Sequence, residues 1–175
     1  MFHKIKKIFF VIIRNFIKPI DCFSPRLYMK LYNSYLRNIG VILNGTPRYI
    51  HPSVKFDGKG YKNTFIGHDV VISRDVLLLN HDFSIACGFR AINRNNQQEA
   101  FWIKDIKIGN NVFIGANASI LPGTIIGDNC IIGTAAVIKG TIPENSVVIG
   151  NPAQIKAKTT DWALKQEQKA DYFFE

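Results

Sequence analysis

Residues 108–153 read IGNNVFIGANASILPGTIIGDNCIIGTAAVIKGTIPENSVVIGNPA, and isoleucine returns in this stretch at every sixth position. The six residues are Ile108, Ile114, Ile120, Ile126, Ile132 and Ile138. Two positions before each later isoleucine stands a small or β-branched residue: Val112, Ala118, Thr124, Cys130 and Ala136. A period of six fits neither the 3.6-residue repeat of a helix nor the alternation of a strand. It predicts a solenoid in which each hexad forms one flat side.

Three such sides with three turns close a triangular prism of about 18 residues per coil, with the stacked isoleucines as its core. A weaker copy of the pattern precedes it, at Ile66, Ile72 and Leu78, with Val70 and Val76 at the small position. Further upstream, Ile50, Val54 and Phe56 indicate a degenerate first coil, as is expected of a terminal repeat. The alternative is chance spacing in ordinary strands, which would not sustain two positional preferences over six hexads.

The stretch from Ile108 to Ala153 is similar to the hexapeptide-repeat acyltransferases, and the resemblance covers roughly residues 50–158. It implies an all-β solenoid, a left-handed parallel β-helix, whose handedness is taken from the family alone. The segment NHDFS at residues 80–84, followed by a long excursion before the coils resume, is similar to the sugar and polysaccharide O-acetyltransferase branch.

The expected organisation is one β-helix domain over residues 41–158, interrupted by a loop at residues 82–105. A basic amphipathic helical segment at residues 1–40 precedes it, and a tail at residues 159–175 could form a short helix. Within the first segment we expect a helix over residues 25–38, with Ser24 as N-cap and Gly40 as its stop. Its predicted packing face carries Leu27, Leu31, Tyr35 and Ile39.

The net charge is +9, and residues 1–40 carry eight Lys or Arg against Asp21 alone. No nucleic-acid-binding motif accompanies these charges, so a nucleic-acid partner is not expected. The uncharged run at residues 8–13 is too short to span a bilayer, and no small-residue cleavage site follows it. We therefore expect a cytoplasmic protein. An amphipathic helix over residues 1–20 would pack on the solenoid or a neighbouring subunit, or would contact the inner face of an anionic membrane.

Neither a disulfide framework nor a metal site is expected. The cysteines Cys22, Cys87 and Cys130 are isolated in the sequence. The four histidines, His3, His51, His68 and His81, lack the close pair that a zinc site on such a prism would need.

Chemistry on a repetitive wall should come from the place where the repeat breaks, which here is residues 80–105. His81 stands at an outward position at the start of this break. An imidazole can accept a hydroxyl proton near neutral pH and return it to a thiolate, as acyl transfer from a thioester requires. The resemblance implies that His81 is the general base. Asp82 could hold its tautomer or simply cap the loop.

The resemblance also implies acetyl-CoA as co-substrate and a homotrimer with the cofactor groove between neighbouring solenoids. The Ala116 N–H would stabilise the oxyanion across a subunit boundary. The cofactor contacts then fall on Phe113, Gly115, Ala116, Thr134 and Lys139, with Lys156 and Lys158 available to the phosphates. Phe113 stands where many of the sugar acetyltransferases carry tryptophan, which puts the acceptor in doubt more than the reaction.

The predicted function is therefore O-acetylation of a sugar or glycan hydroxyl, in the synthesis of a surface polysaccharide such as a capsule, exopolysaccharide or lipopolysaccharide. Acceptor contacts are predicted at Asn80, Trp102 and Arg90, with Arg94 and residues 95–97 as further loop candidates. For Trp102, anchoring of the loop in the core is the competing role. Two other functions stay open: N-acetylation of an amino sugar or nucleotide sugar, and a non-catalytic trimeric scaffold.

Overall fold

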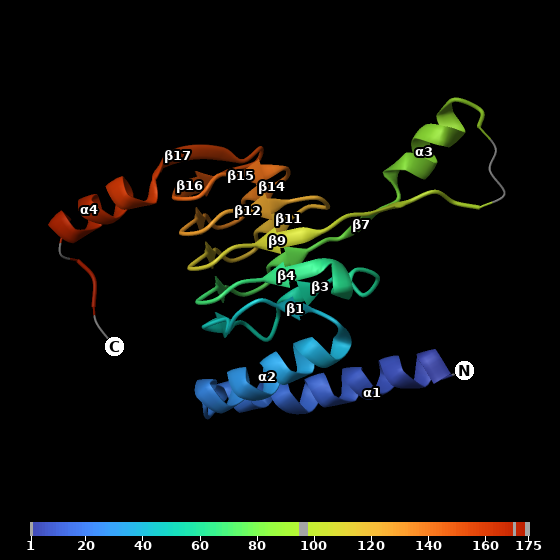
Figure 1. Cartoon of the computed structure of the whole chain (residues 1–175), viewed down its shortest axis with the longest axis horizontal. Coiled ribbons are helices and arrows are strands. Elements are labelled where there is room, and N and C mark those ends of the chain that lie inside the picture. The colour runs from blue at the N-terminus through green and yellow to red at the C-terminus, as the bar shows by residue number, and fades with distance from the viewer. Residues whose placement is uncertain (1, 95–97, 170, 174–175) are drawn as a thin grey trace.

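The computed structural model describes residues 2–94, 98–169 and 171–173, with side chains described from Phe10 onward. Most of the chain forms a stack of triangular coils, shown edge-on in Figure 1. Two helices lie across one end of the stack, and a C-terminal helix leaves from the other. The candidate residues at positions 95–97, and the apolar side chains of the first turns of the N-terminal helix, lie outside the described residues.

Three sheets of short parallel strands form the sides of the prism. The first sheet contains β1 (Ile42–Leu43), β4 (Thr64–Ile66), β9 (Ile106–Ile108), β12 (Ile125–Ile126) and β15 (Thr141–Ile142). The second contains β2 (Tyr49–Ile50), β5 (Val71–Ile72), β10 (Phe113–Ile114), β13 (Ile131–Ile132), β16 (Ser146–Ile149) and, antiparallel at its edge, β17 (Gln154–Lys158). The third contains β3 (Lys55–Phe56), β6 (Leu77–Leu78), β11 (Ser119–Ile120) and β14 (Val137–Ile138).

The register confirms the hexad pattern. Phe113 pairs with Ile131, and Ser119 pairs with Val137, each 18 residues later and therefore one coil further. All six repeat isoleucines are at most 3% exposed, and so are the five small residues that precede them in the hexads. The earlier block at residues 50–78 lies in the same core. Stacked side chains of one kind thus explain why the sequence keeps a six-residue period.

The turns between strands need backbone with positive φ, and Asn or Asp fills most of these positions. Asn111, Asn117, Asn129 and Asn145 have φ between 52° and 59°. Their side chains also connect the coils, because the Asn111 amide donates to Asn129 Oδ1 at 2.8 Å and the Asn129 amide donates to Asn145 Oδ1 at 3.2 Å. Asparagine tolerates this left-handed conformation better than other side chains do.

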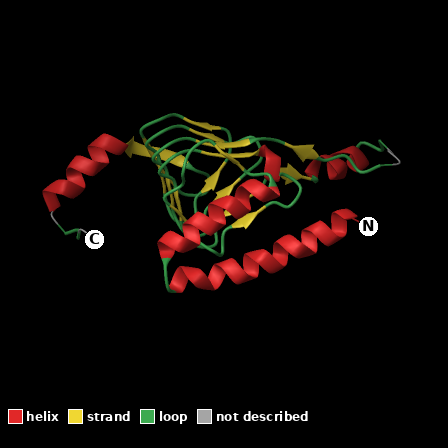
Figure 2. Ribbon diagram, turned by 60° about the horizontal axis from the view of Figure 1, so that its bottom comes forward, coloured by secondary structure: helices red, strands yellow, loops and turns green. Residues whose placement is uncertain are grey.

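Helices α1 (Phe2–Ile17) and α2 (Pro25–Ile39) run side by side in opposite directions across the first coil, joined by a 3-10 turn at Lys18–Cys22 (Figure 2). The predicted boundaries of α2 are confirmed: Ser24 Oγ accepts a hydrogen bond from the Leu27 N–H, and Gly40 ends the helix at φ 107°. None of the helices in the described part of the chain is long and apolar enough to cross a membrane.

The predicted packing face of α2 was partly wrong. Leu27 and Leu31 are exposed, whereas Tyr35 is buried as expected. The helix packs mainly through Tyr28, Tyr32, Tyr35 and Leu36, and the Tyr28 hydroxyl donates to the Ile50 carbonyl at 2.7 Å. Stacked aromatic rings, with centroids 5.1 Å apart for Tyr28 and Tyr32, cover the open end of the prism together with Leu36.

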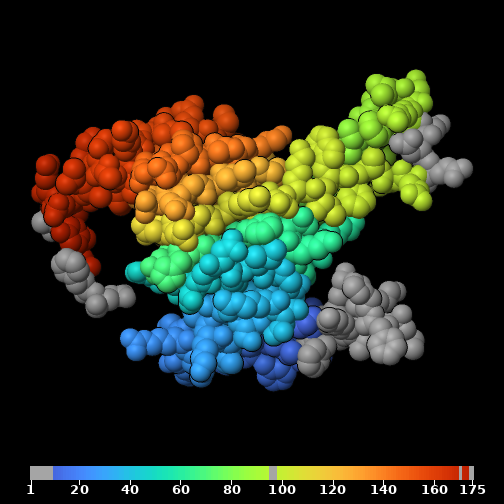
Figure 3. Space-filling view, in the orientation of Figure 1, coloured from blue at the N-terminus to red at the C-terminus, as the bar shows by residue number. Residues whose placement is uncertain are grey.

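The excursion at residues 80–105 is more ordered than a loop. It begins with β7 (His81–Asp82), continues through α3 (Ser84–Ala91) and returns through β8 (Trp102–Ile103), which pairs antiparallel with β7. It projects from the wall as an arm (Figure 3). The last helix is α4 (Thr159–Lys169), which packs against β16 and β17.

Candidate active site

His81 stands where the chain leaves the third sheet and enters the arm. Its side chain is 22% exposed, so the imidazole is reachable without being freely solvated. The His81 Nδ1 is hydrogen-bonded to Asp57 Oδ2, from the corner one coil earlier. This contact leaves Nε2 as the ring nitrogen that can exchange a proton with a bound molecule.

Asp57 is held in place by the backbone around it. Its Oδ2 accepts from the N–H groups of Asn80 at 3.1 Å and His81 at 2.9 Å, and its Oδ1 accepts from the Lys59 N–H at 3.1 Å. Burial by itself would raise the pKa of this carboxyl group, but the hydrogen bonds from His81 and the backbone N–H groups outweigh it and keep the pKa below its usual value. Asp57 is therefore an anion at neutral pH, fixed against the imidazole.

Of the two roles left open for Asp82, the structure supports the loop cap and gives the imidazole a different partner. The Asp82 side chain accepts from the Ser84 N–H at 2.7 Å, where α3 begins, so it caps the turn into that helix. The hydrogen bonds from Ser84 lower the pKa of Asp82. Asp57 was missed because it lies 24 residues upstream. The available signal was an acidic residue directly after Phe56, at the corner that stacks beneath Leu79.

Asn80 is fully buried, which contradicts its predicted contact with the acceptor. Its side-chain amide donates to the carbonyls of Asn63 at 2.9 Å and Lys104 at 3.1 Å, and its Oδ1 accepts from the Thr64 hydroxyl at 2.9 Å. These bonds tie the two ends of the excursion to the coil below. Asn80 thus has no exposed atom to offer a ligand, and it fixes the base of the arm beside His81.

Two aromatic rings and a cation flank His81. The Phe83 ring meets the imidazole edge-on with centroids 5.4 Å apart, and Phe101 lies 5.0 Å from Phe83. Lys59 Nζ sits 4.5 Å from the Phe83 centroid and 4.9 Å from that of Phe101. Both rings are more than one third exposed. Neither they nor Lys59 were singled out from the sequence, because an aromatic in a loop carries no signal of its neighbours.

The other residues predicted to bind the acceptor lie on the arm. Trp102 is 41% exposed, so the competing idea that it anchors the loop in the core was wrong; Lys104 Nζ lies 4.9 Å from its ring. Arg90 is exposed on α3 and forms an ion pair with Glu99 at 3.1 Å. Both could contact a molecule held beside the arm.

The predicted cofactor contacts lie on other parts of the prism. Ala116 and Thr134 lie at the corner between the second and third sheets, and Phe113 is 43% exposed on the second sheet. Lys139 lies at the same corner as His81, close enough to lower the pKa of Asp82. Within one chain, the third sheet separates His81 from Ala116.

The remaining cofactor candidates differ in accessibility. Gly115 is buried, and a Cβ there would lie 2.6 Å from the Thr134 nitrogen, so this glycine is required by coil stacking. Lys156 and Lys158 are exposed on β17. Among the described residues the Ala116 N–H has no hydrogen-bond acceptor, whereas the Ala116 carbonyl accepts from the Ala135 N–H at 2.8 Å. This N–H is thus available as a donor to a bound oxygen.

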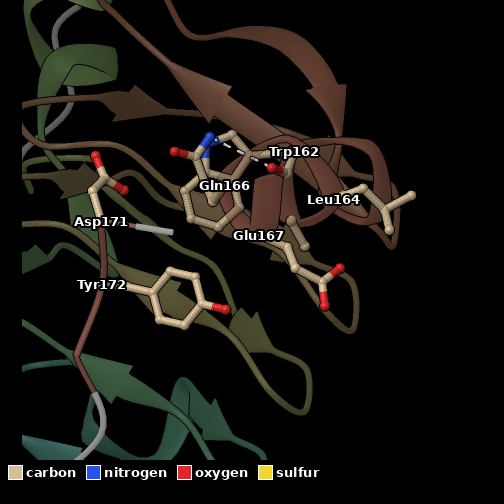
Figure 4. Close-up of a pocket in the computed structure, with 7 residues that line it drawn as sticks. Trp162, Leu164, Gln166, Glu167, Asp171 and Tyr172 are labelled. Atoms are coloured by element: carbon tan, nitrogen blue, oxygen red, sulfur yellow. Dashed lines mark hydrogen bonds between the residues drawn. The ribbon is translucent and has the colours of Figure 1, made fainter. Parts of the chain in front are cut away.

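Two further observations bear on the site. No group of three or more His, Cys, Asp or Glu side chains within residues 2–94, 98–169 and 171–173 is placed to hold a metal ion. A hollow of about 600 Å³ lies between α4 and the C-terminal tail (Figure 4). Its lining includes Trp162, Leu164 and Tyr172, with the carboxylates of Glu167 and Asp171, and it contains no histidine. The acid–base pair at His81 is therefore the stronger candidate for chemistry.

Residues 105–140 match the family model described as "Bacterial transferase hexapeptide (six repeats)". Over 127 residues the chain is 28% identical to YvoF of Bacillus subtilis strain 168, a predicted acetyltransferase, which covers 71% of this chain and 64% of that protein. Over 61 residues it is 38% identical to a polysialic acid O-acetyltransferase of Escherichia coli O1:K1, covering 35% of this chain and 18% of that protein. The chain thus spans less than two thirds of the length of either relative.

Two solved structures share the fold. A galactoside acetyltransferase in complex with coenzyme A superposes with a TM-score of 0.59 at 21% identity, covering 97% of this chain and 86% of that one. A maltose O-acetyltransferase from Clostridium difficile 630 superposes with a TM-score of 0.55 at 22% identity, covering 86% and 88% of the two chains. With the matched repeat, these similarities confirm the left-handed parallel β-helix.

Proposed function

We propose that this chain, a hexapeptide-repeat protein by its sequence and its fold, is an O-acetyltransferase that moves the acetyl group of acetyl-CoA to a sugar hydroxyl. The observation that carries the proposal is the contact between His81 and the buried Asp57 carboxylate at the one long break in the repetitive wall. A histidine oriented by a carboxylate is the arrangement that general-base catalysis requires. Such a pair is not needed to cap a turn.

The proposed mechanism is direct transfer. His81 Nε2 takes the proton of the acceptor hydroxyl while Asp57 stabilises the resulting imidazolium, and the acceptor oxygen attacks the acetyl carbonyl carbon. The Ala116 N–H of a neighbouring chain donates to the oxyanion. When the carbon–sulfur bond breaks, His81 returns the proton to the leaving thiolate. Acetyl-CoA supplies the activated acyl group, and Thr134, Lys139, Lys156 and Lys158 are the exposed side chains that would hold it.

A homotrimer is part of the proposal. His81 and Ala116 lie at different corners of the prism, so a single chain does not bring the base and the oxyanion donor together. A neighbouring prism placed against the arm would supply the missing corner, and three such contacts close a ring. The prediction is one site per subunit boundary.

The acceptor is proposed to be a glycan of a surface polysaccharide. The exposed faces of Phe83 and Phe101 beside His81 offer the apolar surface on which a sugar ring can lie, with Lys59 as a polar neighbour. The polysialic acid O-acetyltransferase to which part of this chain is similar acts, by its name, on a sugar polymer. An amino-sugar N-acetyltransferase would use the same base.

The deciding experiment measures thiol release from acetyl-CoA with a panel of glycans, nucleotide sugars and amino sugars. Wild-type protein should release thiol with at least one acceptor, and His81→Ala should reduce the rate at least about 10³-fold without changing the melting temperature. His51→Ala is the matched histidine control and should keep its activity. An ester product is lost in mild alkali and an amide is not, which separates O- from N-acetylation. Lack of saturable acetyl-CoA binding would leave only the scaffold function.

Peripheral contact with the inner face of an anionic membrane is proposed for the helical end of the molecule. Phe16 and Phe23 are 76% and 88% exposed there, and residues 1–40 carry a net charge of +7. Apolar side chains beside basic ones are what an interfacial helix presents to anionic lipid. Co-sedimentation with anionic vesicles should be lost on deletion of residues 1–20 and kept in a variant that lacks residues 170–175. Equal binding of both variants would refute this contact.

A further inference from the structure

A groove of about 550 Å³ lies between α2 and the turns of the first two coils, at a corner of the prism other than that of His81. Its volume is that of a small-molecule site. One wall is a face of α2, which lies directly beneath the first coil (Figure 1). The other wall is formed by Thr46, Pro47, Arg48 and Tyr49 of the first coil and by His68 and Asp69 of the second.

The α2 wall of the groove is basic. Arg26, Lys30, Asn33 and Arg37 recur at spacings of four, three and four, which places them on one face of the helix. None of the three cations forms an ion pair with any acidic side chain in the described ranges. The Arg37 guanidinium donates instead to the Gly45 carbonyl at 3.4 Å. Three like charges on one helix face repel one another, and a bound anion would relieve that repulsion.

The opposite wall is neutral overall and does not offset the charge of α2. Arg48 forms an ion pair with Asp69 at 3.3 Å, and His68 Nε2 lies 3.1 Å from the other Asp69 oxygen. Asp69, the one carboxylate in the groove lining, therefore already has its partners on the same wall. The groove keeps a net charge of +3 from Arg26, Lys30, Arg37 and Arg48 against Asp69.

Asn33 supplies an independent indication of a ligand. It lines the groove and is only 6% exposed, yet its Oδ1 is buried without a hydrogen-bond partner among the described residues. An unmade hydrogen bond of this kind costs about 1–3 kcal/mol. A rotation of the Asn33 side chain toward the groove that it lines would let a ligand hydroxyl donate to this oxygen, which an anion without an O–H group could not do.

We infer that this groove binds a phosphate ester that carries a neighbouring hydroxyl group, with the phosphate held by Arg26, Lys30 and Arg37 and the hydroxyl by Asn33. The headgroup of an anionic glycerophospholipid and a soluble sugar or glycerol phosphate share this chemistry. The groove is separate from the proposed acetyl-transfer site, because its lining contains neither His81 nor Asp57, and its test needs no turnover.

The test measures binding of glycerol 3-phosphate to the full chain by calorimetry and by thermal shift. The wild-type protein should bind it saturably, and the double variant Arg26→Gln/Lys30→Gln should bind it at least 10-fold more weakly. The matched control is Lys55→Gln/Lys62→Gln, which removes two exposed charges outside the groove and should bind as the wild type does. Equal weakening in both double variants would mean non-specific attraction and would overturn the inference.

Inorganic sulfate, which has no O–H group at neutral pH, tests the role of Asn33. It should bind more weakly than glycerol 3-phosphate to the wild type, and Asn33→Ala should abolish that difference. Vesicles of phosphatidylglycerol, compared with phosphatidylcholine, then separate the two sources. If the Arg26→Gln/Lys30→Gln variant loses vesicle binding, the ligand is a lipid headgroup; if only soluble phosphate esters depend on these residues, it is a small molecule. No binding of either probe would overturn the site.

Discussion

The coils at residues 106–142 and the corner that carries the arm differ in what they bury. In the coils the interior is a column of aliphatic side chains, and Thr124 is the buried polar residue there, with its hydroxyl donating to the Leu121 carbonyl at 2.7 Å. Beneath the arm, Asp57, Thr64 and Asn80 are all buried and are joined to the backbone by hydrogen bonds. Apolar stacking gives the prism its stability, and the polar cluster orients one side chain.

The largest expected effect on stability comes from a change in the column. Ile126→Ala removes a side chain that is 1% exposed, and we expect a loss of about 3–4 kcal/mol in the free energy of unfolding, as for other large-to-small core changes. Ile125→Ala, at a 43% exposed neighbour, should cost less than about 1 kcal/mol. Urea unfolding followed by circular dichroism measures both. Similar losses of unfolding free energy in the two variants would mean that Ile125 on the outward face is packed as tightly as Ile126 in the core.

A change in the polar cluster should instead have its main effect on catalysis. Asp57→Asn keeps the shape of the side chain but only one of its two acceptor oxygens, so one backbone N–H contact is lost, and it no longer holds the imidazole by charge. We expect kcat for acetyl transfer to fall about 10²-fold or more, with little change in the KM for acetyl-CoA. Asp82→Asn, which alters only the cap of α3, should stay within about threefold of the wild type. Steady-state kinetics of thiol release separates the two carboxylates.

Equal losses in the two variants would contradict the assignment of Asp57 as the positioning residue. A loss that falls on KM instead of kcat would also contradict it, because a residue that acts through the imidazole should not alter how acetyl-CoA is held.

The same cluster gives a dependence of stability on pH. The pKa of Asp57 is lower in the folded chain than in an unfolded one, where it is about 3.9, so the ionised group stabilises the fold. This contribution is fully present above about pH 4 and is lost as the pH falls through the folded pKa. The difference in melting temperature between wild type and Asp57→Asn should thus shrink as the pH falls below about 4. If the difference in melting temperature grew below pH 4, the pKa of Asp57 would have to be higher in the folded chain than in the unfolded one, which would contradict the assignment.

The two regions also differ in how far the sequence predicts them. The coils follow from a local rule, because each residue of a hexad meets its equivalent 18 residues away, and a period read along the chain becomes a contact in space. The place of His81 could be predicted in the same way, as the point where the rule fails. The helix boundaries at Ser24 and Gly40 were equally local, since a cap acts on its own turn.

What could not be predicted depends on contacts across a break in the pattern. Asp57 reaches His81 only because the corner after β3 stacks beneath the corner after β6, and no period marks that pairing. For the same reason Asn80 was expected to face a ligand, although its hydrogen bonds to Asn63 and Lys104 draw it inward. On α2, the choice between leucines and tyrosines as the packing face was set by the shape of the prism end, which lies outside the helix sequence.

The smallest expected effect tests the turn rule of the regular coils. Ala135 has a φ of 57°, at a kind of turn position where asparagine or aspartate stands in other coils. The left-handed conformation costs a side chain with a Cβ about 1–2 kcal/mol, while glycine in its place gives up unfolded-chain entropy worth about 0.4–1 kcal/mol. Ala135→Gly should therefore stabilise the fold by about 0.5 kcal/mol, seen as a higher urea midpoint at an unchanged m-value. Ala136→Gly is the control, because Ala136 is buried in the column and its loss should destabilise. If both variants lose stability, relief of the left-handed conformation is not the dominant effect at this turn. The hydrogen bond from the Ala135 N–H to the Ala116 carbonyl would then make the corner more rigid than its φ alone implies.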